Sequence, residues 1–179
     1  MSKNIVILSG SPRKGGNTDR LVDAFVSGAK AAGKEIALFR VADLKIGGCR
    51  GCCHCFKAQG VCIQKDDMPP ILDALRKADA LVFASPVYYF GVTAQLKLTV
   101  DRFFALLKEG MPVQCAALLM TCGADTDEAA AASVGMFRQI CGYQKWEDAG
   151  FVIAPRLHNP GEIEGRPELE QAKSLGGSI

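Results

Sequence analysis

Short apolar runs of strand length alternate along this chain with stretches of helical periodicity, and this alternation limits the fold more than any other feature. The strand-like runs are residues 4–10, 35–41, 80–86, 113–123 and 145–153. Runs this apolar are typical of strands that are buried on both faces. Helices are predicted at residues 18–32, 67–77, 93–108, 126–141 and 167–175. The pattern predicts an α/β sandwich, in which a parallel sheet carries helices on both faces.

No internal repeat or linker interrupts this pattern, so residues 1–179 are expected to form a single domain with an insert at 44–66. The chain has 21 basic and 19 acidic residues, and this near balance gives no reason to expect a nucleic acid or a membrane as partner. No apolar stretch is long enough for a signal peptide or a membrane span. We therefore expect a cytoplasmic protein whose thiols stay reduced.

The loop after the first predicted strand, SGSPRKGGNT (residues 9–18), is rich in polar groups. It lacks the spacing of the dinucleotide fingerprint and of the nucleotide P-loop. Its hydroxyls, amide, guanidinium and free helix N–H groups suit a terminal phosphate monoester. A plain polar turn, in which Asn17 or Thr18 caps the helix, is the alternative. The candidate residues are Ser9, Ser11, Pro12, Arg13, Asn17 and Thr18.

Two further loops follow the third and fourth predicted strands. The sequence SPVYYF carries three consecutive aromatic residues, which suit stacking on a flat ring or packing across a subunit interface, unless they fold back onto the core. The small residues of TCGADTD allow a ligand to approach the backbone closely, although a helix-capping loop would look similar. The candidate residues are Ser85, Pro86, Val87, Tyr88, Tyr89, Phe90, Thr121, Cys122 and Gly123.

Five of the eight cysteines fall within CRGCCHCFKAQGVC, residues 49–62. The spacing C-x2-C-x2-C-x6-C selects Cys49, Cys52, Cys55 and Cys62, and leaves Cys53 as a spare that is expected to point away. Closely spaced thiolates on a glycine-rich loop suit a cubane iron–sulfur cluster. A zinc site, a labile disulfide and unligated thiols at an interface are the alternatives.

Other chemically capable residues are expected to have structural roles. Asp66 and Asp67 are predicted to cap the helix that begins near Pro69, where negative charge is favourable. His54 and His158 have no evident partner, and surface loop positions are expected for both.

The segments SGSPRKGGNT, C-x-G-C-x-x-C…G-x-C…DDM and SPVYYFGVTAQLKLTVDR together resemble the flavodoxin-like NADPH-dependent FMN reductase family, and within it the iron–sulfur flavoprotein branch. The resemblance spans most of residues 3–150. It implies a flavodoxin-like five-stranded sheet of order 2-1-3-4-5 and a tightly bound FMN. The phosphate of FMN would lie on the first loop, and its ring against residues 86–90 and 121–123. A [4Fe–4S] cluster on the four cysteines and a homodimer or homotetramer are also implied.

The expected function is that of an FMN-dependent oxidoreductase that passes electrons between NAD(P)H or a one-electron carrier and an acceptor, through the cluster. The acceptor would be a flavin, a quinone or another small molecule, and NAD(P)H as a transient donor is implied by the resemblance alone. A non-enzymatic electron-transfer flavoprotein serving a ferredoxin-like partner, a cluster-free flavin or quinone reductase, and a non-redox scaffold are the alternatives. No residue is expected to act as a nucleophile or general base, because the flavin carries the chemistry.

Overall fold

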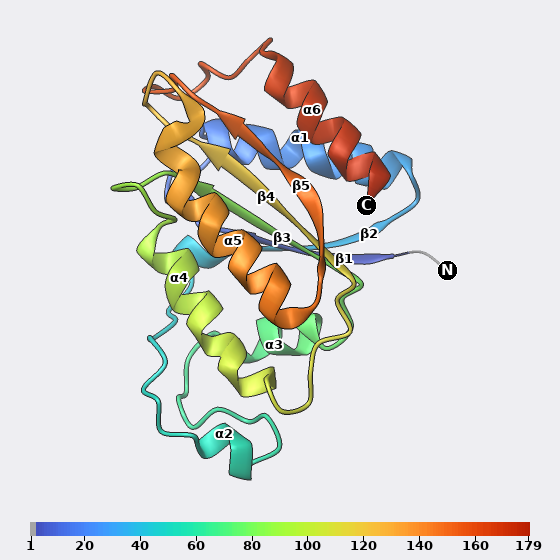
Figure 1. Ribbon diagram of the computed structural model, residues 1–179, viewed down its shortest axis with the longest axis vertical. Helices are drawn as coiled ribbons and strands as arrows, with labels where there is room; N and C mark the ends of the chain where they lie inside the picture. The colour runs from blue at the N-terminus through green and yellow to red at the C-terminus, as the bar shows by residue number, and fades with distance from the viewer. Residues whose placement is uncertain (1–2) are drawn as a thin grey trace.

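The computed structural model describes residues 3–179 and contains one five-stranded parallel sheet (Figure 1). The strands pair in the order β2-β1-β3-β4-β5. This confirms the predicted fold class and strand order. The strands are β1 (Asn4–Ser9), β2 (Glu35–Arg40), β3 (Ala80–Pro86), β4 (Cys115–Thr121) and β5 (Glu147–Ala154).

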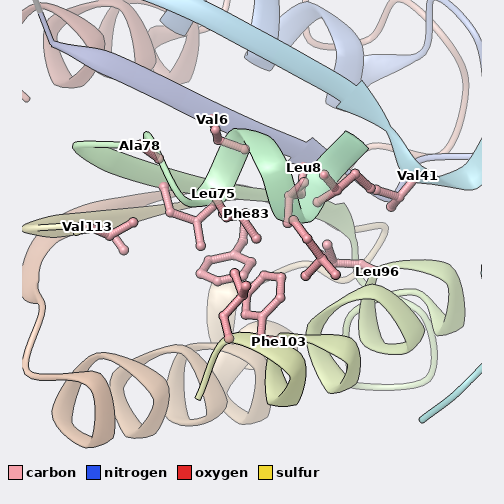
Figure 2. Close-up of a cluster of buried hydrophobic side chains, with 14 of the residues drawn as sticks. Val6, Leu8, Val41, Leu75, Ala78, Phe83, Leu96, Phe103 and Val113 are labelled. Atoms are coloured by element: carbon pink, nitrogen blue, oxygen red, sulfur yellow. The ribbon is translucent and has the colours of Figure 1, made fainter. Parts of the chain in front are cut away.

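Helices cover both faces of the sheet (Figure 1). Successive side chains of a strand point to opposite faces, so Ile5 and Ile7 enter one core while Val6 and Leu8 enter the other. Figure 2 shows the second core, where Phe83 lies near Phe103. The first core packs against α1 (Asn17–Ala31) and α6 (Pro167–Ser178), and the second against α3 (Pro69–Leu75), α4 (Ala94–Asp101) and α5 (Ala131–Gln144).

Helices α1 and α6 approach each other so closely that their crossing requires glycine. A Cβ atom on Gly28 would overlap the carbonyl oxygen of Lys173, and one on Gly176 would overlap the carbonyl oxygen of Phe25. This crossing holds the C-terminal part of the chain against the helix that follows the β1 loop.

The helix predicted at 93–108 changes type partway along its length. It is α-helical only to Asp101 and continues as the 3₁₀ helix η2 (Arg102–Leu106). In a 3₁₀ helix residues three apart lie on the same side, and Arg102 with Ala105 and Phe103 with Leu106 are all buried here. A second short 3₁₀ helix, η3 (Asp127–Ala130), precedes α5.

The insert at 44–66 extends away from the sheet beneath α4 (Figure 1). It follows a single 3₁₀ turn, η1 (Val41–Asp43), and its regular structure is limited to the short helix α2 (His54–Lys57). The ring of Phe56 stacks on that of Phe104 with 4.7 Å between centroids, which fixes α2 against η2. Among residues 3–179, no helix is both long and apolar enough to cross a bilayer.

Candidate functional site

A cavity of about 230 Å³ lies at the carboxyl edge of the sheet, where the loops after β1, β3, β4 and β5 meet. Five of the candidate residues are outside its lining: Ser9, Pro12, Ser85, Tyr89 and Phe90. The residues that line it are Ser11, Arg13, Asn17, Thr18, Pro86, Val87, Tyr88, Thr121, Cys122, Gly123, Leu157 and His158.

The predicted phosphate loop, residues 9–18, is shaped by contacts with neighbouring elements. Its Gly15 N–H donates to Asp19 Oδ2, and Arg40 of β2 binds both carboxylate oxygens of Asp19 at 2.6 Å. Arg40 also donates to the carbonyl oxygen of Ser11. The loop is therefore held from two sides before any ligand binds.

Helix α1 begins at the end of this loop without a side-chain cap. Its N-cap residue is Gly16, so Asn17 and Thr18 are the first helical residues and neither caps the helix. The N–H groups of the first turn have no acceptor within the helix and carry the positive end of its dipole. Such groups suit an anion, and Asn17 and Thr18 of this turn line the cavity.

Two of the predicted phosphate ligands also hold other parts of the chain. The Asn17 amide donates to the carbonyl oxygen of Asn159 at 2.8 Å and accepts from the Gly161 N–H at 2.9 Å. Arg13 donates through its Nη1 to the carbonyl oxygen of His158 at 3.1 Å. Asn17 would thus offer a phosphate chiefly its backbone N–H, while Arg13 retains further donors.

The start of helix α1 is joined to the end of strand β4 at the cavity by a buried hydroxyl pair. Thr18 Oγ1 and Thr121 Oγ1 lie 2.7 Å apart. At the end of β1, Ser9 is 1% exposed and its Oγ has no hydrogen-bond partner among the described residues. Ser9 thus carries an unsatisfied polar atom beneath the loop.

The segment after β5 completes the cavity, and sequence reasoning missed it. The Leu157 N–H donates to the carbonyl oxygen of Cys122, which places the segment beside the β4 loop. His158 Nδ1 lies 2.9 Å from the position that a Cβ on Gly123 would take, so the glycine makes room for the imidazole. No local pattern marks His158, because its neighbours at the site come from distant parts of the chain.

A carboxylate fixes the conformation of this segment. Glu162 accepts the N–H groups of His158 at 2.6 Å and Asn159 at 2.9 Å. It also accepts the Asn159 side-chain amide at 2.8 Å. These hydrogen bonds, above all those from Asn159, lower the pKa of Glu162 to about 2.

The aromatic residues after β3 form an exposed turn. Tyr89 is 99% exposed, Phe90 is 65% exposed and Tyr88 is 47% exposed, so they do not fold back onto the core. Tyr89 and Phe90 have φ of 50° and 67°, a strained conformation for aromatic residues. Ser85 holds the base of the turn, where its Oγ accepts the N–H of Thr93.

The lining fits FMN in its chemistry. The β1 loop supplies hydroxyls, the Arg13 guanidinium and the N–H groups of the first helical turn, a set that suits a phosphate monoester. The other loops supply the apolar and aromatic surfaces of Val87, Tyr88 and Leu157, which suit a flat ring. The small side chain of Gly123 leaves backbone accessible beside that surface.

The cysteines of the insert form a second candidate site. Cys49, Cys52, Cys55 and Cys62 line one cavity of about 20 Å³, together with Arg102. Burial raises the pKa of the Cys55 thiol, and the nearby Cys62 and Cys49 raise it further. All four are free thiols, and within residues 3–179 no three His, Cys, Asp or Glu side chains are gathered closely enough to hold a metal ion.

The four thiols fit an iron–sulfur cluster in number and in their placement around one cavity, and the loop would have to gather them more closely to bind one. Cys53, expected to point away, also lines the cavity, and its Sγ lies 3.6 Å from the carbonyl oxygen of Gly51.

A buried ion pair closes the neck of the insert. Arg102 Nη1 lies 2.5 Å from Asp66 Oδ2, and Arg102 Nη2 lies 3.2 Å from Asp66 Oδ1. Arg102 also donates to the carbonyl oxygen of Gly47, whose N–H donates to Asp66. Burial alone would raise the pKa of Asp66, but the hydrogen bonds from Arg102, Gly47 and Met68 lower it.

The predicted helix-capping role of Asp66 and Asp67 is wrong. Helix α3 begins after Met68 with no side-chain cap, because Asp66 pairs with Arg102 and Asp67 accepts the backbone N–H of Lys45. The two aspartates join the ends of the insert instead. Arg102 lies far along the chain from Asp66, so no local signal in the sequence pointed to the pair.

Comparison with known proteins shows the family of this chain. The profile of the NADPH-dependent FMN reductase family matches residues 3–150. An iron–sulfur flavoprotein of Archaeoglobus fulgidus is 42% identical over 93 residues, which cover 52% of this chain and 42% of that protein. An iron–sulfur flavoprotein of Methanocaldococcus jannaschii is 40% identical over 98 residues, which cover 55% of this chain and 50% of that protein. The chain thus matches half or less of the length of these relatives.

A putative NAD(P)H-dependent FMN-containing oxidoreductase of Bacillus subtilis is similar over a longer span, with 27% identity over 89% of this chain and 88% of that protein. Two solved structures share the fold. An azoreductase of Bacillus anthracis superposes with a TM-score of 0.75 at 18% identity over 100% of both chains. An NAD(P)H:quinone oxidoreductase of Methanothermobacter marburgensis has a TM-score of 0.73 at 15% identity, covering 99% of this chain and 96% of that one.

The matched residues 3–150 include the phosphate loop, the cysteine insert, the aromatic turn and the β4 loop, which together make up most of both candidate sites. This chain belongs to the NADPH-dependent FMN reductase family.

Proposed function

We propose that this protein is an FMN-dependent oxidoreductase that passes electrons between NAD(P)H or a one-electron carrier and a small acceptor such as a flavin or quinone. The cavity at the carboxyl edge of the sheet carries the proposal, because it combines an anion-binding helix start with apolar and aromatic ring-binding surfaces. Bound FMN would supply both hydride and single-electron chemistry. The residues of this chain bind and orient it: Ser11, Arg13 and Thr18 at the phosphate, and the residues around Val87 and Gly123 at the ring.

We further propose that Cys49, Cys52, Cys55 and Cys62 hold a [4Fe–4S] cluster. The proposal is supported by the single cavity that the four thiols share and by the similarity to proteins named iron–sulfur flavoproteins. A cluster exchanges single electrons, so FMN and cluster together would connect a two-electron donor with a one-electron carrier. If the four cysteines held zinc or remained unligated thiols, the protein would be a cluster-free flavin or quinone reductase.

The charge of the insert favours a protein partner that is acidic. Residues 44–66 contain four basic side chains and one acidic, whereas the rest of the chain contains 17 basic and 18 acidic. The single acidic residue, Asp66, is paired with Arg102. The four basic residues are exposed and form no ion pair with any acidic residue in the described range: Lys45, Arg50, Lys57 and Lys65. Such a surface would attract a negatively charged carrier of the ferredoxin type.

An apolar groove of about 760 Å³ between α4, η2 and α5 supports self-association into a homodimer or homotetramer. The groove includes Tyr143, which is 70% exposed in the single chain. Sedimentation of the FMN-loaded protein tests this, and a monomer at micromolar concentration would contradict it.

The principal test is anaerobic purification followed by a visible spectrum and by measurement of flavin, iron and sulfide per chain. We expect one FMN and about four irons per chain. Rapid bleaching of the flavin by NADPH would identify the reductase, and bleaching only by reduced ferredoxin would identify the electron-transfer protein. A colourless protein that cannot be reconstituted with FMN would contradict the whole proposal.

A further inference from the structure

Arg102 is the largest fully buried side chain in the described part of the molecule, and it faces the cysteine cavity. Arg102 is 1% exposed, and it lines that cavity together with Cys62 and Cys55. A buried guanidinium normally has acceptors for all its N–H groups, because an unsatisfied one costs about 1–3 kcal/mol.

The hydrogen-bond partners of Arg102 account for only part of its donors. Its two Nη atoms bind the Asp66 carboxylate and the carbonyl oxygen of Gly47. Its buried Nε has no partner among the described residues. The contacts that close the neck of the insert therefore leave the Nε–H without an acceptor in the described range, on a side chain that lines the same cavity as the cysteines.

The chemistry of the neighbouring sulfurs explains this unused donor. Thiolates, alone or bound to iron, are anionic and accept hydrogen bonds, and such bonds shift the reduction potential of a cluster. The reduced state carries one more negative charge than the oxidised state, so a nearby cation stabilises it more.

We propose that Arg102 is a positioning residue of the cysteine site, which donates its Nε–H toward the sulfur ligands and favours the one-electron-reduced state through its positive charge. This inference rests on the cluster proposed above. The electron gained comes from FMN or from the external carrier, and no bond of Arg102 forms or breaks.

Asp66 allows this role to be separated from a purely structural one. Its carboxylate neutralises much of the guanidinium charge, so Asp66→Asn leaves more positive charge beside the sulfurs and is expected to raise the potential. The double variant Asp66→Asn/Arg102→Gln removes both charges and the Nε donor, and is expected to lower it. A structural role predicts no such opposite shifts.

The test is an anaerobic redox titration, followed by electron paramagnetic resonance, of the wild type, Asp66→Asn, the double variant and Arg76→Gln. Arg76 is a matched control because it forms ion pairs with Asp73 and Glu109 beside the insert and does not line the cysteine cavity. We expect roughly tenfold changes of opposite sign in the reduction equilibrium, about 59 mV each for one electron. The control should match the wild type, and all variants should retain FMN.

Each outcome decides the inference. Unchanged potentials, or shifts of the same sign in both Asp66 variants, overturn it while leaving the cluster intact. If the double variant loses iron, the direction in which the reduction potential of Asp66→Asn shifts decides the inference. If Asp66→Asn loses iron as well, the pair is structural and the inference is overturned. A wild type that binds no iron after reconstitution instead overturns the proposed cluster, and the inference with it.

Discussion

The two candidate sites rest on different kinds of support. The proposed FMN cavity lies where loops leave the strands of one sheet. Direct hydrogen bonds tie its parts together, such as Thr18 to Thr121 and the Val87 N–H to the carbonyl oxygen of Thr121. The cysteine site lies on an insert whose regular structure is one four-residue helix, held by the Asp66–Arg102 pair and the Phe56–Phe104 stack.

This difference predicts how the sites behave when they are altered. The position of the cavity at the sheet edge depends on the strands, because the sheet fixes where its loops begin. The cysteine loop has one short helix as its regular structure, so a bound cluster would add to the contacts that hold the loop. Damage to one site should therefore leave the other largely intact.

The largest expected effect is the loss of iron when a cluster ligand is removed. Cys55→Ala should reduce iron from about four per chain to nearly none while the FMN content is unchanged. Cys53→Ala is the matched control and should keep its iron. Iron and flavin analysis of anaerobically purified protein measures both, and equal iron in the two variants would contradict the ligand assignment.

Arg13→Ala should weaken FMN binding without affecting iron. Loss of hydrogen bonds to a charged phosphate typically costs about 1.5–3 kcal/mol, or roughly a ten- to hundredfold increase in Kd. Lys14→Ala is the control, because Lys14 pairs with Asp43 and does not line the cavity. Fluorescence titration of apoprotein with FMN measures the Kd, and equal affinities for the two variants would exclude Arg13 as a phosphate ligand.

Gly28→Ala tests the close crossing of helices α1 and α6. Overpacking at α1 and α6 should lower the free energy of unfolding by about 1–3 kcal/mol. Each kcal/mol lowers the Tm by roughly 2–4 °C in a chain of this size. A Cβ on Gly142 of α5 would meet nothing within 4 Å, so Gly142→Ala should be neutral or slightly stabilising. Thermal unfolding measures both, and an unchanged Tm for Gly28→Ala would refute the close crossing.

The smallest expected effect is a pH dependence of the segment that carries His158. The pKa of Glu162 is about 2 in the folded protein, below its ordinary value of 4.5, so its contribution to stability is full above about pH 4.5 and is lost as the pH falls toward 2. Between pH 5 and pH 3, the fraction of FMN released should therefore rise more steeply with falling pH in the wild type than in Glu162→Gln. Identical pH profiles would show that Glu162 does not support FMN binding.

Local patterns were sufficient for the elements and for most of the loop residues at the FMN cavity. Apolar runs and helical periodicity depend on neighbours a few residues away, so the strands lie within two residues of their predicted bounds. The loops at the strand ends followed from the parallel arrangement, which places them at one edge. The helix at 93–108 was predicted too long, because periodicity does not distinguish an α-helix from the 3₁₀ turn of η2.

The sequence by itself determined the fold class, the polar and aromatic loops and the cysteine spacing, because each is written in short stretches of chain. Only the tertiary structure decided that Asn17 holds the segment after β5, that His158 enters the cavity and that Asp66 pairs with Arg102. It also decided that glycine is needed at the α1–α6 crossing. These contacts join residues that are distant in the chain, and they arise only once the sheet and its two helical layers have packed.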